Sequence, residues 1–181
     1  MLRKSIHRLR QLVLLAACAV VAWWGWHYWR EHRFDKVIYQ AAQRYQLDPA
    51  VVKALVWRES RFNPDARGRA GEVGLMQIRE EAALEWASSE HLQDFDYSAC
   101  LDPATNTLAG TWYLKTVMRH YKQVDNPLPY ALAEYNAGGV NVRKWRTGAA
   151  ATNSQEFLSQ ITFPGTRAYV RAIMNRSECY R

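Results

Sequence analysis

The stretch DPAVVKALVWRESRFNPDARGRAGEVGLMQ, residues 48–77, decides the fold and the candidate chemistry of this chain. Asp48 and Pro49 are typical of a helix start, because aspartate caps the first amides and proline fits the first turn. The predicted helix has one apolar face, formed by Val52, Leu55 and Val56. Glu59 is the next residue on that stripe. A carboxyl group therefore occupies a position where a core residue is expected.

Glu59 is the first candidate for acid-base chemistry. Asn63 and Pro64 end the predicted helix, so Glu59 lies near its C-terminal end. Burial and the negative end of the helix dipole both disfavour an ionised carboxylate, and a carboxyl group that keeps its proton can act as a general acid. A second interpretation is open, in which Glu59 lies on the helix flank and pairs with Arg58 or Arg61.

The next segment is a glycine-rich loop that ends in GLMQ, residues 74–77. An uncharged amide near a buried acid can bind an N-acyl group or a hydroxyl without adding a competing charge. The alternative is that the loop only covers the core and that Gln77 binds backbone groups.

Four motifs in order now carry a resemblance: Glu59-Ser60, GLMQ at 74–77, EYNAG at 134–138 and FPGTRAYV at 163–170. This pattern, from about Lys36 to Tyr180, resembles the lysozyme-like lytic transglycosylases of the soluble-lytic-transglycosylase type. The resemblance implies an all-α, lysozyme-like (goose-type) domain that acts on peptidoglycan glycan strands. It implies no cofactor.

The resemblance also implies a mechanism in which Glu59 is the single acid/base. It would protonate the β-1,4 bond after N-acetylmuramic acid and then deprotonate the 6-hydroxyl of that sugar, which gives a 1,6-anhydro end. The acetamido group of the substrate would assist at the anomeric carbon, so no protein nucleophile is required. The alternatives are a hydrolytic muramidase, a non-catalytic wall-binding module and, more remotely, a chitin-cleaving enzyme.

The substrate-binding residues that the resemblance implies are Ser60, Met76, Gln77, Tyr135 and Asn136. Met76 and Gln77 are expected to line a sugar subsite. Tyr135 is expected to hydrogen-bond Glu59 or the transition state, and Asn136 a neighbouring sugar amide. A competing interpretation of Ser60 is that it closes the helix end.

Two positions depart from the family pattern. Gly68 stands where many relatives have a serine that contacts substrate, and Glu72 stands where alanine is usual. Glu72 is expected to be a solvated loop charge. An alternative hypothesis makes Glu72 a second carboxylate that activates water, which would make the enzyme partly hydrolytic.

Charge and metal-binding patterns narrow the function classes. The net charge is +7, but residues 34–181 hold 18 basic and 16 acidic side chains, a net charge of +2. That balance does not favour nucleic-acid binding. The five histidines are scattered and the sequence has no HExxH or CxxC motif, so a metal site is not expected.

The N-terminus predicts a membrane anchor. Residues 1–10 are basic, 11–29 are apolar and long enough to span a bilayer, 30–35 form a linker, and 36–181 form the transglycosylase-type domain. The positive-inside rule places the N-terminus in the cytoplasm and the domain in the periplasm, anchored to the inner membrane. An alternative is a lipoprotein anchored through Cys18, which follows Leu15-Ala16-Ala17.

The remaining sequence predicts helices and one open question about cysteines. No stretch alternates with period two, which favours an all-α fold. Tyr113 is expected in the core. Cys100 and Cys179 can form a disulfide in an oxidising compartment or stay as separate thiols. Helices are predicted at 36–46, 48–62, 79–88, 102–122, 130–137, 140–146, 154–160 and 164–176.

Overall fold

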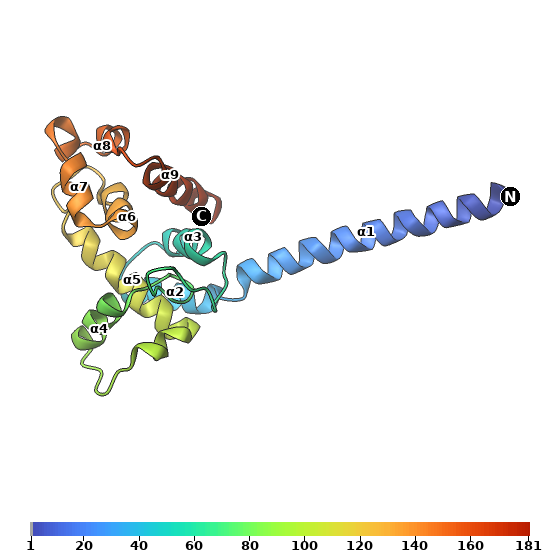
Figure 1. Ribbon diagram of the computed structural model, residues 1–181, viewed down its shortest axis with the longest axis horizontal. Helices are drawn as coiled ribbons and strands as arrows, with labels where there is room; N and C mark the ends of the chain where they lie inside the picture. The colour runs from blue at the N-terminus through green and yellow to red at the C-terminus, as the bar shows by residue number, and fades with distance from the viewer. Residues whose placement is uncertain (1) are drawn as a thin grey trace. The chain divides into compact units, whose positions relative to one another are not determined.

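The computed structural model describes residues 2–181, with side chains described from Arg10 onward. The chain divides into two units, one ending at Phe34 and the other running Asp35–Arg181 (Figure 1). The first unit consists of a continuous helix, α1 (Leu2–His32), which extends beyond the predicted 11–29 span at both ends.

The apolar side chains of α1 are exposed to solvent, with Leu14 at 65% and Trp24 at 65%. Within the part of the chain that the structure describes, one helical segment near the N-terminus is long and apolar enough to cross a membrane. This finding rests on length and composition, and a signal sequence has the same properties.

The second unit is all-α, as predicted. In the described residues, extended pairing is limited to two isolated bridges, Arg67 with Val73 and Val73 with Ile78. The helical elements are α2 (Asp35–Arg44), α3 (Pro49–Ser60), α4 (Glu80–Ser89), η1 (Tyr97–Leu101), α5 (Pro103–Arg119), α6 (Pro127–Ala137), α7 (Gly139–Trp145), η2 (Gly148–Ala151), α8 (Ser154–Gln160) and α9 (Pro164–Cys179).

Aspartate or asparagine caps with a following proline start three of these helices. Asp48 accepts a hydrogen bond from the Ala50 amide, and Asp102 accepts one from the Thr105 amide, both at 2.9 Å. The predicted starts of α3 and α5 are therefore confirmed. The helix predicted at 130–137 starts too late in the sequence, and this start was wrong. Asn126 caps α6 instead, so the helix begins at Pro127.

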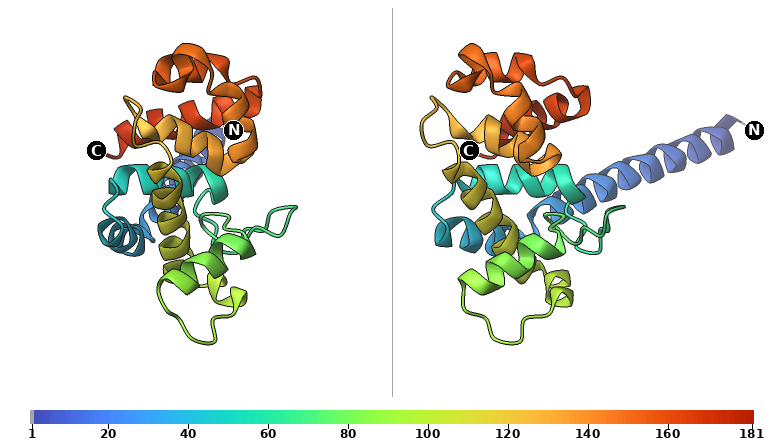
Figure 2. Two further views of the ribbon diagram at one scale, coloured as in Figure 1. Left: turned by 90° about the vertical axis from the view of Figure 1, so that its left-hand side faces the viewer. Right: turned by 60° about the vertical axis from the view of Figure 1, so that its left-hand side comes forward.

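Helix α5 is the central element of the Asp35–Arg181 unit. It packs against α2, α4, η1 and α6, while α6 also packs against α9, and α9 packs against α3. Figure 2 shows α4 and the following loop at one end of α5 and α6–α9 at the other. The apolar face of α3 is completely buried in this arrangement, with Val52, Leu55 and Val56 at 0% exposure.

Asn106 of α5 holds the loop between α3 and α4. Its side chain is fully buried, accepts a hydrogen bond from the Met76 amide at 2.8 Å, and donates to the carbonyls of Val73 (2.9 Å) and Cys100 (2.8 Å). Gly74 lies against this side chain at φ 77°, and a Cβ there would overlap with the Asn106 amide. One buried side chain thus satisfies three backbone groups and fixes the GLMQ loop.

The two cysteines of the second unit are separate thiols. Cys100 is buried in η1, and Cys179 is exposed at the end of α9; both are free. Cys100 belongs to an apolar cluster between α4 and α5, whereas the Cys179 thiol contacts the Asn175 carbonyl in its own helix. The structure thereby resolves the open question against a disulfide.

Candidate active site

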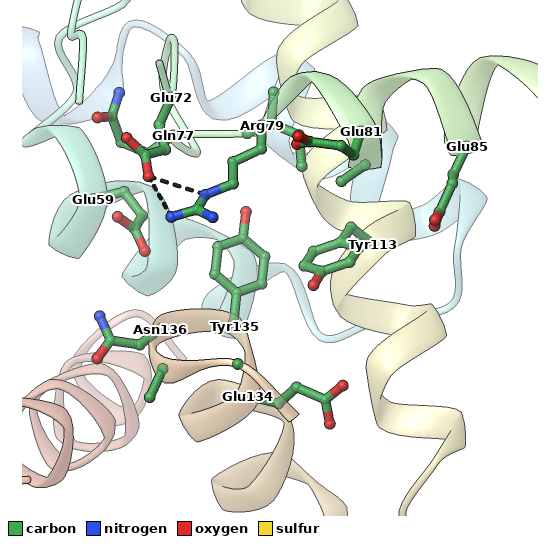
Figure 3. A pocket seen from close by; sticks show the side chains of 14 residues that line it. Glu59, Glu72, Gln77, Arg79, Glu81, Glu85, Tyr113, Glu134, Tyr135 and Asn136 are labelled. Carbon is green, nitrogen blue, oxygen red and sulfur yellow. Dashed lines mark hydrogen bonds and ion pairs between the residues drawn. The ribbon is translucent and has the colours of Figure 1, made fainter. Parts of the chain in front are cut away.

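A cleft of about 470 Å³ lies beside the C-terminal end of α3. It is lined by Glu59 from α3, by the loop that carries Glu72 and Gln77, by the start of α4, by Tyr113 of α5 and by the end of α6 (Figure 3). Segments far apart in the sequence therefore line one cleft, and Glu59 lies in its wall.

Glu59 sits where the apolar stripe of α3 reaches this cleft. The pKa of Glu59 is raised from 4.5 to about 7; burial is the main cause, and the negative charge of Glu72 acts in the same direction. The Tyr169 hydrogen bond and the charge of Arg58 act in the opposite direction. Burial is the largest cause, so a large share of the Glu59 carboxyl groups carries a proton at neutral pH.

Tyr169 of α9 is the direct partner of Glu59, and the sequence did not indicate this. Its hydroxyl donates a hydrogen bond to Oε1 of Glu59 from 110 residues further along the chain. The ring is 1% exposed, and Arg58 lies over it at 5.1 Å from the ring centre. The alternative interpretation paired Glu59 with Arg58 or Arg61; the charge of Arg58 acts on Glu59, whereas Arg61 stacks on Trp57 at 3.8 Å from the ring centre.

Tyr135 lines the cleft but does not take the predicted place at Glu59. Its hydroxyl donates to the Met76 carbonyl at 2.8 Å, which connects the end of α6 with the GLMQ loop. Burial raises the pKa of Tyr135 well above its ordinary value, and the charge of Glu59 acts in the same direction. Tyr135 therefore stays a neutral phenol in the cleft.

The Met76 side chain is fully buried, which corrects its predicted position in a sugar subsite. Its sulfur accepts from the Thr111 hydroxyl at 3.7 Å in the core, so only its backbone carbonyl serves the cleft, through Tyr135. For Ser60 the structure supports the role at the helix end and corrects its place among the substrate-binding residues. Ser60 is 8% exposed and donates to the Val56 carbonyl at 3.2 Å, and so closes the end of α3.

Gln77 and Asn136 both line the cleft. Nε2 of Gln77 donates to the carbonyls of Ala66 and Gly74, each at 3.0 Å, which uses both hydrogens of the amide group. Gln77 therefore binds backbone groups, as the alternative interpretation proposed, and also lines the cleft. Oδ1 of Asn136 accepts from the Thr166 hydroxyl at 2.8 Å. Gln77 retains an acceptor and Asn136 a donor.

Glu72 is not the solvated loop charge that was expected. Its side chain is 19% exposed and pairs with Arg79, whose Nε and Nη2 lie 3.0 and 2.9 Å from Oε1. Its Oε2 accepts from the Ala70 amide at 3.0 Å. Hydrogen bonds within the loop and from Arg79 lower the pKa of Glu72. A Cβ at Gly68 would overlap with this carboxylate.

Three further cleft residues were not recognised from the sequence. Tyr113, expected in the core, has its ring 5.3 Å from that of Tyr135 in the cleft wall. Glu134 accepts from the Tyr121 hydroxyl and lies 3.3 Å from Nδ1 of His120. Arg79 lies in extended backbone just before α4. No local sequence pattern indicates that its side chain points toward the cleft. In the described residues, no group of three or more His, Cys, Asp or Glu side chains is arranged to hold a metal.

The helical fold and its cleft define a lysozyme-like domain. Residues 36–158 match the Transglycosylase SLT domain family, and the chain belongs to this family. It is 31% identical over 157 residues to the soluble lytic murein transglycosylases of Salmonella typhimurium and Escherichia coli, covering 83% of this chain and 24% of each relative. It is 33% identical over 119 residues to membrane-bound lytic murein transglycosylase F of Desulfosudis oleivorans, covering 64% of this chain and 24% of that relative.

Solved structures agree with this assignment. The 70 kDa soluble lytic transglycosylase of Escherichia coli has a TM-score of 0.72 and 27% identity, with 84% of this chain and 25% of that chain covered. An inactive mutant of the lytic transglycosylase Slt from Pseudomonas aeruginosa has a TM-score of 0.72 and 26% identity, covering 80% and 23%. This chain spans about a quarter of the length of these relatives.

Proposed function

We propose that this protein is a peptidoglycan lytic transglycosylase in which Glu59 is the single acid/base. The observation that carries the proposal is the environment of Glu59: a carboxyl group beside a cleft, with a pKa raised to about 7 mainly by burial. Such a group can donate a proton to a glycosidic oxygen near neutral pH and accept one afterwards. Membership of the SLT domain family supports the substrate class.

The chemistry proceeds in two proton transfers. Glu59 first protonates the oxygen between N-acetylmuramic acid and N-acetylglucosamine, and the bond to the anomeric carbon breaks as positive charge develops there. The ionised Glu59 then removes the proton from the 6-hydroxyl of the same N-acetylmuramic acid. That oxygen forms the new bond to the anomeric carbon, and Glu59 regains its proton. Tyr169 donates to the ionised form between the two transfers.

Gln77 and Asn136 supply complementary polar contacts for N-acetylated sugars. The Gln77 oxygen accepts from an amide or a hydroxyl, and the Asn136 amide group donates to an acetamido carbonyl, because their other polar atoms are already bonded. Tyr135 contributes a rigid aromatic wall against a sugar ring.

Glu72 is a poor candidate for the second carboxylate of a hydrolytic muramidase. Arg79 binds one of its oxygens and the Ala70 amide binds the other. Its lowered pKa makes it a weak base. The transglycosylase reaction, which needs only one protein carboxyl group, fits this arrangement better.

Mass spectrometry of the products from purified wall glycan tests the proposal. Wild-type protein is expected to release fragments with anhydro ends, which are one water lighter than reducing ends. Glu59→Gln keeps the shape of the side chain and removes the acid, so its turnover is expected to fall by about 10³-fold. Reducing ends from the wild type, or undiminished lysis by Glu59→Gln, would sink the assignment.

We also propose that the segment 11–29 anchors the domain 36–181 in the inner membrane with the cleft on the periplasmic side. The apolar character of α1, the basic N-terminus and a membrane-bound relative support this location. Alkaline phosphatase fused after residue 181 should be active in cells, and β-galactosidase should not. The mass of the mature protein tests Cys18, because lipoprotein processing would remove the residues that precede it.

A further inference from the structure

Arg79 is the one cationic side chain among the described residues that line the cleft. The carboxyl groups there come from Glu59, Glu72, Glu81, Glu85 and Glu134. An anionic group of a ligand is therefore repelled along most of the cleft, and Arg79 is the position at which it can be accommodated. The acid-base chemistry proposed for Glu59 does not use this guanidinium.

The guanidinium of Arg79 is bonded along one edge and open along another. Nε donates a hydrogen bond to Oε1 of Glu72 at 3.0 Å, and Nη2 lies at ion-pair distance, 2.9 Å, from the same oxygen. The opposite edge, formed by Nη1 and the outer hydrogen of Nη2, has no partner within residues 10–181, whose side chains are described. That edge matches the two oxygens of a carboxylate. The side chain is 62% exposed, so a ligand in the cleft can reach it.

The loop is built to hold Arg79 in this orientation. The Glu72 carboxylate is fixed by the Ala70 amide at 3.0 Å and by Arg79 itself. It fits because Gly68 has no side chain, since a Cβ there would overlap with Oε2 of Glu72. Gly68, Glu72 and Arg79 therefore form one unit, and the two departures from the family pattern become a single structural feature.

Figure 3 shows the Arg79 side chain reaching from the start of α4 into the cleft, between Glu72 and the Tyr135 ring. We propose that the open edge of Arg79, held in place by Glu72, is a binding site for a carboxylate of the peptidoglycan. This inference rests on the proposed function for its substrate class. The carboxylate comes either from the lactyl group of N-acetylmuramic acid, which is free where the stem peptide is missing, or from the stem peptide itself.

Three forms of one glycan distinguish these sources. The first carries its stem peptides, the second has them removed by an amidase so that lactyl carboxylates are free, and the third is the second with those carboxylates converted to amides. The full-length protein, Arg79→Gln, Arg79→Lys and Arg69→Gln are compared by kcat and KM for the release of anhydro ends. Arg69 is the matched control, because it is an exposed arginine of the same loop.

Arg79→Gln is expected to raise KM about fivefold on the glycan that presents the recognised carboxylate, the size of a solvent-exposed charged pair. Arg79→Lys keeps the charge without the two-pronged edge and is expected to recover only part of the loss. A rise on the stem-free glycan that disappears after amidation identifies the lactyl carboxylate, whereas a rise confined to the stem-bearing glycan identifies the peptide. Arg69→Gln is expected to match the wild type throughout.

The two proposals fail in distinguishable ways. If the wild type releases anhydro ends and Arg79→Gln has wild-type KM values on all three glycans, the carboxylate site is wrong and the proposed function stands. If the wild type releases no anhydro ends from any glycan, the proposed function fails and the carboxylate site fails with it.

Discussion

Glu59 and Glu72 line the same cleft, yet the two walls that carry them treat a carboxyl group in opposite ways. At the end of α3, burial raises the pKa of Glu59 to about 7, and the partner of its carboxyl group is the neutral hydroxyl of Tyr169. In the loop before α4, backbone amides and Arg79 lower the pKa of Glu72. The surroundings of each side chain, rather than its chemical type, assign one residue to proton transfer and the other to structure.

The difference also explains how a single acid can serve in a cleft with several carboxyl groups. Glu72 stays ionised, and its negative charge helps Glu59 to keep its proton. Pairs of titratable groups whose surroundings push their pKa values apart are typical of acid-base sites. The following variants test whether the two walls really differ in this way.

The largest loss of stability is expected when the loop that carries Glu72 loses its anchor on α5. Asn106→Ala removes the partner of the Met76 amide and of the carbonyls of Val73 and Cys100, all in a buried site. We expect the free energy of unfolding to fall by about 4 kcal/mol, since each buried unsatisfied group costs about 1–3 kcal/mol. Urea denaturation measures this. Asn141→Ala, which removes one bond to the Ala137 carbonyl, is the control; an equally small loss from both variants would refute the role of Asn106.

Removal of the Glu59 charge is expected to stabilise the fold above neutral pH. The pKa of Glu59 is about 7 in the folded protein and about 4.5 when exposed, so the folded state binds the extra proton between these values. The contribution of Glu59 to stability therefore falls as pH rises from 4.5 to 7 and stays low above 7. Glu59→Gln should exceed the wild type by about 3 kcal/mol at pH 8, because one pKa unit is worth about 1.4 kcal/mol.

Denaturation at pH 4 and pH 8 checks this expectation. The two proteins should be equally stable at the lower pH, where both side chains are neutral. The exposed Glu85 provides the matched control, Glu85→Gln, which should follow the wild-type pH dependence. A Glu59→Gln variant that is less stable than the wild type at pH 8 would mean that the ionised carboxylate is well solvated.

Tyr169→Phe changes the surroundings of Glu59 alone and is expected to raise its pKa. In the wild type the Tyr169 hydrogen bond lowers the pKa of Glu59. The variant lacks this bond, so the pKa of Glu59 rises further. Because the protonated form starts the reaction, the loss of activity with rising pH should move to higher pH. We expect kcat/KM to fall about tenfold near neutral pH, since the ionised intermediate form of Glu59 loses a charge-assisted hydrogen bond. A pH profile that moves to lower pH would contradict this role for Tyr169.

Glu72→Gln is expected to give the smallest change, with the opposite sign. The negative charge of Glu72 raises the pKa of Glu59, so its removal lowers that pKa. Activity should then be lost at lower pH than in the wild type, while anhydro ends remain the product. Reducing ends that disappear in Glu72→Gln would instead show that Glu72 activates water.

The sequence predicted the parts of this site that depend on local pattern. The caps at Asp48 and Asp102 and the apolar stripe of α3 fix where helices begin and which face is buried. The stripe also leads directly to Glu59. In contrast, the sequence pattern placed the start of α6 at residue 130, whereas the N-cap at Asn126 places it at Pro127. Capping residues therefore predict where a helix starts when no nearby proline or glycine favours another boundary.

The contacts that define the chemistry depend on segments far apart in the chain. No periodicity brings Tyr169 to Glu59, and the alignment of Arg79 on Glu72 depends on the space beside Gly68. The sequence also could not show that Met76 points into the core while its carbonyl faces the cleft side, because both follow from how the loop is held by α5. These features require the packed structure.

A direct titration of the side-chain carboxyl groups by carbon-detected NMR, with Glu59→Gln to assign the signal, tests the account most sharply. Glu59 is expected to titrate near pH 7, with Glu72 below its ordinary range. A Glu59 signal that titrates near 4.5, like an exposed glutamate, would leave the cleft without a proton donor at neutral pH and would contradict the central claim.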